Sequence, residues 1–292
     1  MKPARFRYVR PASLDEAVDL LAEHGPDAAV LAGGQSLVPL MNQRLRCPAA
    51  LIDLNFVTEL NGRDDGEASL VIGALVRQRE LESDGALGRA EPLLAEASRF
   101  VGNRQVRNRG TLVGSLAFAD PAAEYPAVLV ALGATATARS VRGEREISCA
   151  NVATGAFSCS LAADELITSV RVPKAGARRG SAYTEVAERR GARALAGAAA
   201  VVELESDGWV SSCRVVLVGV SDVPLQVGGL DRLRGQPIPT DEEIRELLTA
   251  WSNEIPVRPD RRADPRYKRA LAAEMSIRAL RRAAGRARRL AG

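Results

Sequence analysis

Two glycine turns, far apart in the chain, are the segments best suited to chemistry. The first is Ala-Gly-Gly-Gln-Ser at 32–36, and the second is Arg-Asn-Arg-Gly-Thr-Leu-Val-Gly-Ser at 107–115. Each precedes a segment that predicts a helix, and backbone amides at a helix N-terminus carry partial positive charge. Glycine lets such amides approach a phosphate closely, so two turns suit one long diphosphate ligand. A Gly-Gly turn is also often only a sharp connection between a strand and a helix.

Other common chemical motifs are missing from the sequence. Neither G-x-G-x-x-G nor G-x-x-x-x-G-K-[ST] occurs, which counts against a Rossmann dinucleotide site and a P-loop. The four cysteines form no C-x-x-C pair, so we expect free thiols rather than a zinc ribbon or an iron–sulfur cluster. The only histidine, His24, precedes a Gly-Pro turn, where a favourable contact with a helix C-terminus is the simpler explanation. We therefore expect no metal site and no triad hydrolase.

The elements around the first turn form a short α/β unit. Ser13 and Glu16 have capping-box spacing and begin a helix that Gly25 and Pro26 end. A strand ends at Ala32, the glycine turn follows, and a second helix begins near Ser36. A second strand is predicted at 50–55.

The rest of the chain alternates strands and helices. A strand begins at Ser69, loop and helix follow to about 101, and an apolar helix follows the second turn. Strands are predicted over 135–172, and the basic, glycine-rich segment 174–180 is the best linker candidate. An Asp-Gly turn at 207–208 predicts a hairpin, and two further helices follow, the first capped by Thr240.

Composition places the chain among ordinary folded proteins. It has 292 residues, of which 46% are hydrophobic and 26% charged. No apolar run approaches the roughly 18 residues of a membrane span, and the N-terminal segment lacks the apolar stretch of a signal peptide, so we expect a cytoplasmic protein without membrane contacts. The net charge is only +4 and aromatic residues are 4%, which does not favour nucleic-acid binding.

The arginine-rich C-terminal helix has two interpretations. Apolar residues recur on one face at 280, 283, 284, 287 and 290, which leaves the arginines on the remaining surface. The helix is then either simply solvated on its basic face or docked on an acidic partner subunit.

Several segments together resemble a known family. These are AGGQSLVPLMNQRL with LIDLN, then IGALVRQRELE, RNRGTLVGSLAFADPAAEYPAVL and YKRALAAEMSIRALRRA. In this order, over nearly the whole chain, they resemble the FAD-binding medium subunit of molybdenum hydroxylases, which include carbon monoxide dehydrogenase and the flavin domain of xanthine dehydrogenase.

The resemblance implies an α+β fold. Residues 1–176 would form an FAD-binding domain of the vanillyl-alcohol-oxidase (p-cresol methylhydroxylase) type, with subdomains at about 1–56 and 57–176. Residues 177–292 would form a C-terminal α+β domain of the carbon monoxide dehydrogenase flavoprotein type.

The resemblance also carries cofactor-binding positions onto this sequence. The first FAD loop, whose amides would hold the pyrophosphate, corresponds to Ala32, Gly33, Gly34, Gln35 and Ser36. The second loop, which would meet the phosphates and ribityl chain, corresponds to Thr111, Leu112, Val113, Gly114 and Ser115. Single positions near the flavin are Glu124, a carboxylate, and Val101 and Ile167, both apolar. Without a cofactor role, Thr111 would be a helix cap, Glu124 a surface acid, and Val101 and Ile167 plain core.

The sequence departs from the family pattern at three places. Val113 replaces a glycine, and a β-branched residue would be strained there if the position required a positive φ. Arg193 stands where many members have an aromatic residue, and it either places a cation near the flavin or points to solvent. Thr184 and Glu185 stand where a lysine is often found.

The resemblance implies an electron-transfer subunit with FAD as its cofactor. A large molybdenum-cofactor subunit would oxidise the substrate, a small [2Fe-2S] subunit would relay electrons, and this chain would pass them through FAD to an external acceptor. No catalytic residue toward the primary substrate is then assigned. The alternatives are a free-standing FAD-dependent oxidoreductase, monomeric or homodimeric, and a scaffold that has lost FAD.

Overall fold

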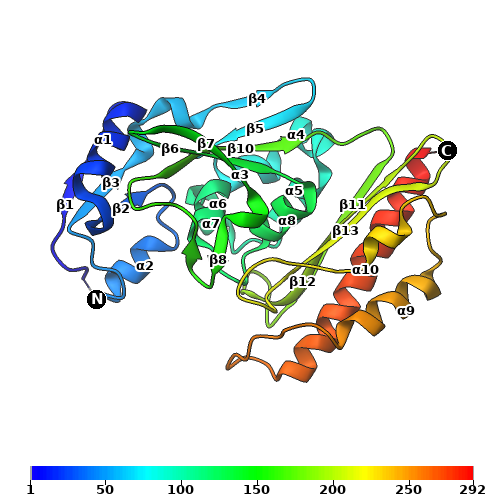
Figure 1. Cartoon of the computed structure of the whole chain (residues 1–292). Helices are drawn as coiled ribbons and strands as arrows, with labels where there is room; N and C mark the ends of the chain where they lie inside the picture. The colour runs from blue at the N-terminus through cyan, green and yellow to red at the C-terminus, as the bar shows by residue number, and fades with distance from the viewer. Residues whose placement is uncertain (1, 292) are drawn as a thin grey trace.

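The computed structural model describes residues 2–291 (Figure 1). It contains two large hydrophobic cores separated by a β-sheet, and a third, small cluster in the N-terminal segment. The N-terminal segment forms a three-stranded parallel sheet in the order β1-β3-β2. Its strands are β1 (Arg7–Val9), β2 (Ala28–Leu31) and β3 (Ala50–Asp53). The helical segments around them are α1 (Leu14–His24), η1 (Gly25–Asp27), α2 (Leu37–Asn42), η2 (Leu54–Phe56) and η3 (Thr58–Asn61).

The second sheet is antiparallel and has five strands in the order β4-β5-β10-β6-β7. They are β4 (Arg63–Asp65), β5 (Ser69–Gly73), β6 (Thr135–Ser140), β7 (Gly143–Ser148) and β10 (Leu166–Pro173). Its helices are α3 (Gln78–Ser83), α4 (Gly85–Ala90), α5 (Pro92–Ser98), α6 (Arg104–Arg109), α7 (Leu112–Phe118), α8 (Glu124–Leu132) and η4 (Cys149–Asn151). A small hairpin of β8 (Ala153–Gly155) and β9 (Ser158–Cys159) completes this part.

The third sheet is antiparallel in the order β11-β12-β13-β14. It comprises β11 (Arg179–Ala187), β12 (Ala194–Leu204), β13 (Val210–Val218) and β14 (Leu225–Gln226). The chain ends with η5 (Leu230–Leu233), α9 (Asp241–Ser252) and α10 (Pro265–Ala291). Within the described part of the chain, no helix is both long and apolar enough to cross a membrane.

The third sheet is buried on both faces. Side chains alternate along a strand, so Ala199 and Val201 of β12 face the larger core, while Ala198 and Ala200 face the core beneath α10. The fully buried helix α8 packs on one face, and α10 packs on the other (Figure 1). This explains the apolar run of β12, which shows no alternation of polar and apolar residues.

The structure corrects the expected linker at 174–180. Arg179 and Gly180 already belong to β11, and both are buried. A Cβ atom on Gly180 would lie 2.0 Å from the carbonyl oxygen of Ala283, so α10 crosses β11 backbone to backbone. The guanidinium of Arg179 pairs with Glu91, and both side chains are 2% exposed. Arg179 therefore forms a buried ion pair that links the two halves of the chain.

Other differences from the expected elements are local. Strand β1 was not predicted, because three residues are too short for a pattern to show. The predicted helix after the loop at Arg77 is broken into α3, α4 and α5. Only half of the expected capping box forms. Ser13 Oγ accepts from the amide of Glu16, but the Glu16 carboxylate accepts from the amide of Ala12 instead of that of Ser13. Leu290, expected on the apolar face of α10, is 57% exposed.

The basic face of α10 is used within the chain itself. Arg282 and Arg286 both pair with Glu96 of α5. Arg282 also donates to the carbonyl oxygen of Tyr183, and Arg286 donates to that of Ser181, on the outer edge of β11. Neither earlier interpretation of this helix foresaw an acidic partner within the same chain.

Candidate functional site

The two glycine turns lie against each other in the folded chain. A Cβ atom on Gly33 would lie 2.3 Å from the carbonyl oxygen of Arg109 and 2.7 Å from Cα of Gly110. These distances are far below a real contact, so a side chain at Gly33 would force the turns apart. Segments separated by more than seventy residues thus form one surface.

The first turn leaves a series of backbone donors without acceptors. Gly34 has a φ of 72°, a left-handed conformation that glycine adopts without strain. Its carbonyl oxygen accepts from the amide of Val38, 3.0 Å away. Within the described residues, nothing accepts from the amides of Gly33, Gly34, Gln35 and Ser36. Successive unpaired amides at such a turn form a concavity that favours an anion.

The second turn begins α7. Thr111 Oγ1 accepts from the amide of Gly114 at 2.9 Å, and a Cβ atom on Gly114 would lie only 2.7 Å from that oxygen. Thr111 is therefore a helix cap, and Gly114 gives it room. Leu112 and Val113 are buried, and their amides precede any helical acceptor. The amide of Ser115 donates to the carbonyl oxygen of Thr111.

Val113 carries none of the strain that a positive φ would bring. It lies in the first turn of α7, and it is not among the non-glycine residues with positive φ. Its side chain packs in the larger core. Replacing a family glycine by valine is therefore compatible with the turn.

Two residues that the sequence analysis did not assign hold the turns together. Asn55 donates from Nδ2 to the carbonyl oxygen of Ala32 at 2.9 Å. Arg77 donates to Asn55 Oδ1 and, from Nη1, to the carbonyl oxygen of Arg109 at 2.7 Å. A continuous chain of hydrogen bonds thus runs from one turn to the other. Asn55 belongs to LIDLN and Arg77 to IGALVRQRELE, two of the segments that carry the family resemblance.

Glu124 is a buried acid at the start of α8. It is 6% exposed, which excludes the surface acid considered above. No other residue in the range 2–291 donates a hydrogen bond to its carboxyl group through a side chain or a loop amide. Burial, together with the charges of Glu185 and Asp120, raises the pKa of Glu124 to about 8. At neutral pH this carboxyl group is mostly protonated.

The remaining predicted positions lie at different places. Val101 and Ile167 are both buried in the larger core, as they would be without a cofactor role. Arg193 pairs with Asp120 at 2.9 Å while its side chain remains 62% exposed. It is therefore tied to the segment between α7 and α8, and it is also open to water.

The residues of the two glycine turns fit a ligand that carries a diphosphate. The two touching turns offer unpaired amides, which suit a diphosphate. Glu124 is a separate buried acid. The turn residues can bind and orient a ligand. None of them is arranged as a nucleophile with an adjacent base.

Comparison with known families covers nearly the whole chain. Residues 4–175 match the family described as the FAD binding domain in molybdopterin dehydrogenase. Residues 181–283 match the C-terminal domain of the CO dehydrogenase flavoprotein.

Two relatives are similar over nearly their full length. The caffeine dehydrogenase subunit beta of Pseudomonas sp. (strain CBB1) is 38% identical over 294 residues, covering 98% of this chain and 97% of that protein. The carbon monoxide dehydrogenase medium chain of Hydrogenophaga pseudoflava is 36% identical over 281 residues, covering 96% and 97%.

Solved structures agree in fold. Carbon monoxide dehydrogenase from Hydrogenophaga pseudoflava superimposes with a TM-score of 0.93 at 36% identity, covering 98% of this chain and 99% of that one. Quinoline 2-oxidoreductase from Pseudomonas putida 86 gives 0.91 at 32% identity, with the same coverage.

Proposed function

The chain belongs to the family of FAD-binding medium subunits of molybdenum hydroxylases, and we propose that it receives electrons from an iron–sulfur partner and passes them through FAD to an external acceptor. It is a subunit of a multi-subunit dehydrogenase and carries an FAD-binding domain. The proposed partners are a large molybdenum-cofactor subunit and a small [2Fe-2S] subunit. The proposed boundary between the FAD-binding and C-terminal domains is residue 176.

The observation that carries the site assignment is the contact between the two glycine turns. In the proposed complex, the amides of Gly33 to Ser36 and the start of α7 hold the diphosphate of FAD. Asn55 and Arg77 keep the two turns at one spacing. FAD supplies the redox chemistry, and the chain supplies binding, orientation and exclusion of water. The primary substrate is oxidised on another subunit in this proposal.

A spectrum and a reduction experiment test the function. We expect the purified chain, incubated with FAD, to show flavin absorbance that heat releases. We expect a reduced [2Fe-2S] protein to reduce this FAD, whereas small-molecule substrates of hydroxylases do not reduce it directly. Direct turnover of such a substrate by the isolated chain would favour a free-standing oxidoreductase. A chain that stays colourless would favour a scaffold.

Gly34→Val tests the first turn. A β-branched residue at a φ of 72° costs about 1–3 kcal/mol, and its Cβ would also press on Leu31 and Val38 at 3.1 and 3.2 Å. We expect FAD retention to fall sharply, measured as bound flavin per chain after gel filtration. Gly34→Asn adds the same Cβ, but asparagine tolerates left-handed backbone better, so we expect this control to lose less FAD than the valine variant. Full occupancy in the valine variant would remove the diphosphate assignment.

A further inference from the structure

Gln78 is a buried polar residue that lies directly against the second glycine turn. It is the first residue of α3, and it is 5% exposed. Its backbone amide donates to the carbonyl oxygen of Gly110 at 2.9 Å, and its side-chain Nε2 donates to the carbonyl oxygen of Thr111 at 3.2 Å. One glutamine therefore binds two successive carbonyl groups of the turn.

Arg77, the residue before Gln78, binds the neighbouring carbonyl group. Its Nη1 donates to the carbonyl oxygen of Arg109 at 2.7 Å. Arg77 also forms an isolated antiparallel β-bridge with Thr111, so the two segments lie side by side. The three carbonyl groups at 109, 110 and 111 thus all have hydrogen-bond donors on one dipeptide.

Gly110 is enclosed between Gln78 and the first glycine turn. A Cβ atom on Gly110 would lie 2.6 Å from Gln78 Oε1 and 2.9 Å from Gln78 Cδ. From the other turn, a Cβ atom on Gly33 would lie 2.7 Å from Gly110 Cα. The backbone of the second turn therefore has little room to move away from the side-chain amide of Gln78.

The hydrogen bonds fix which end of the Gln78 amide faces Thr111. A carbonyl oxygen can only accept, so the donor nitrogen faces Thr111 and Oε1 is directed toward Gly110. Within residues 2–291, nothing donates to this buried Oε1. A buried acceptor without a donor costs free energy, so stability alone does not explain a glutamine at this position.

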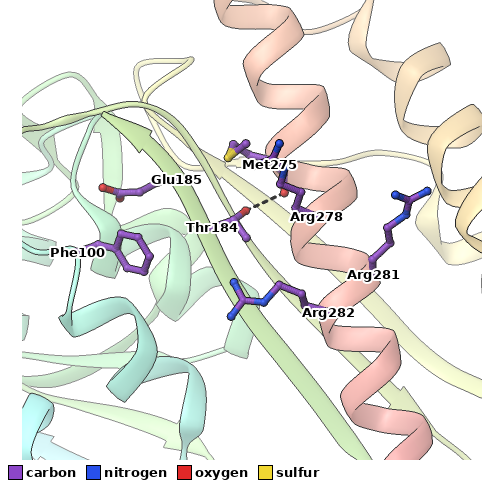
Figure 2. Close-up of a pocket in the computed structure, with 7 residues that line it drawn as sticks. All are labelled: Phe100, Thr184, Glu185, Met275, Arg278, Arg281 and Arg282. Atoms are coloured by element: carbon purple, nitrogen blue, oxygen red, sulfur yellow. Dashed lines mark hydrogen bonds between the residues drawn. The ribbon is translucent and has the colours of Figure 1, made fainter. Parts of the chain in front are cut away.

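The arginine-rich pocket between β11 and α10 is separate from the two turns. Its volume is about 380 Å³, and none of its lining residues belongs to either turn. Figure 2 shows Arg281 and Arg282 leaving α10 in different directions. Arg278, Arg281 and Arg282 are each paired with an acid of this chain. This pocket therefore contributes no charge to an anion held at the turns.

The direction of the carbonyl groups decides whether the second turn favours an anion. Amide hydrogens carry partial positive charge, and carbonyl oxygens carry partial negative charge. A peptide group that rotated would present its oxygen to a diphosphate in place of its amide. The bonds from Arg77 and Gln78 oppose such a rotation at 109, 110 and 111.

We propose that Gln78 is a positioning residue for FAD, because it binds the carbonyl groups of Gly110 and Thr111 and so keeps their oxygens away from the diphosphate. The proposal rests on the function proposed above, in which the second turn meets the diphosphate. Gln78 itself does not touch FAD in this proposal. It acts through the backbone of the turn and sets the affinity for the cofactor.

Gln78→Glu tests the donor through pH. Glutamate has the same shape, but the oxygen that replaces Nε2 donates to Thr111 only while the carboxyl group is protonated. Burial favours the neutral form and raises the pKa of such a group. The measured quantity is the FAD dissociation constant of the variant divided by that of the wild type, by flavin fluorescence. We expect this ratio to be below about two at pH 5 and above about ten at pH 9.

The charged groups around this position do not account for such a change. They lie on or beside α3 and α6, and they are Arg77, Arg79, Glu80, Glu82, Arg107 and Arg109. A hydrogen bond from Arg107 holds the pKa of Glu82 below its usual value, so Glu82 stays ionised from pH 5 to pH 9. All these groups are also present in the wild type, and their effect on FAD cancels in the ratio.

Gln78→Leu and Gln105→Glu complete the comparison. Gln78→Leu removes the donor at similar volume, so we expect FAD binding to weaken about threefold to tenfold, as for one lost hydrogen bond, and equally at both pH values. Gln105 is exposed on α6, close to the same turn. Gln105→Glu adds the same charge without touching the carbonyl groups, and we expect it to bind FAD like the wild type at pH 5 and pH 9.

The outcomes separate this proposal from the proposed function. A wild type that binds FAD, with a Gln78→Glu ratio that is equal at pH 5 and pH 9, would overturn the role of Gln78 and leave the function standing. A wild type that binds no FAD would overturn both. Unfolding without FAD is followed for each variant at both pH values. If Gln78→Glu is unfolded at pH 9, Gln78→Leu decides, and wild-type affinity in that variant would overturn the proposal.

Discussion

We expect Gly33→Ala to weaken FAD binding about tenfold to a hundredfold, which corresponds to about 1–3 kcal/mol for an inserted methyl group in a packed site. The added Cβ would lie 2.3 Å from the Arg109 carbonyl oxygen, a backbone atom that no side-chain rotation can move away. The two turns would therefore separate, and the amides of one turn would lose their spacing to those of the other. The measurement is the dissociation constant of FAD by flavin fluorescence.

Gly176→Ala is the control for Gly33→Ala. No heavy atom lies within 4 Å of a Cβ atom at Gly176, and its φ is not positive. We expect this variant to bind FAD like the wild type. If Gly33→Ala also keeps wild-type affinity, the contact between the turns does not position the cofactor.

Arg179→Met is expected to destabilise the chain by about 3–5 kcal/mol, because it leaves a buried carboxylate without its partner. Arg179 and Glu91 connect β11 to the helices of the FAD-binding half, and both side chains are 2% exposed. Arg179 also donates to the carbonyl oxygen of Pro173. The measurement is the free energy of unfolding from urea denaturation with FAD absent.

The double variant Arg179→Met with Glu91→Leu separates lost charge from lost packing. Two apolar residues of similar size often replace a buried ion pair at little cost, so we expect most of the stability to return.

The stability of the single variant Arg179→Met should also depend on pH. Burial already raises the pKa of Glu91 to about 7 with Arg179 beside it. Without the arginine the folded state binds the proton more tightly, so stability falls as the pH rises from about 5 to 8. A loss that is equal at pH 5 and pH 8 would contradict this explanation.

The sequence predicted the two turns because their residue types act locally. Glycines at 33 and 34, followed by Ser36, indicate a turn and a helix start from neighbouring residues alone. The helix capped by Thr240 was predicted for the same reason, and its capping box with Glu243 is present. The family resemblance added what local patterns lack, namely FAD as the ligand proposed for both turns.

Long-range partners explain what could not be predicted. Arg179 stands in a basic, glycine-rich segment that is typical of a linker, and only Glu91, far away in the sequence, makes it a buried residue. No local pattern marks Asn55 and Arg77, because their roles depend on hydrogen bonds to carbonyl groups of the two turns. Glu185 was identified only as a departure from the family. The cofactor roles of Val101 and Ile167 remain predictions.

The arginines on the outer edge of β11 also affect how readily this edge can pair with a strand of another molecule. An edge strand normally offers free carbonyl groups to any other strand, and this invites uncontrolled association. Here Arg282 and Arg286 already occupy the carbonyl groups of Tyr183 and Ser181, and Glu96 holds both arginines in place. This edge of β11 therefore offers fewer free acceptors with which the strand of another molecule could pair.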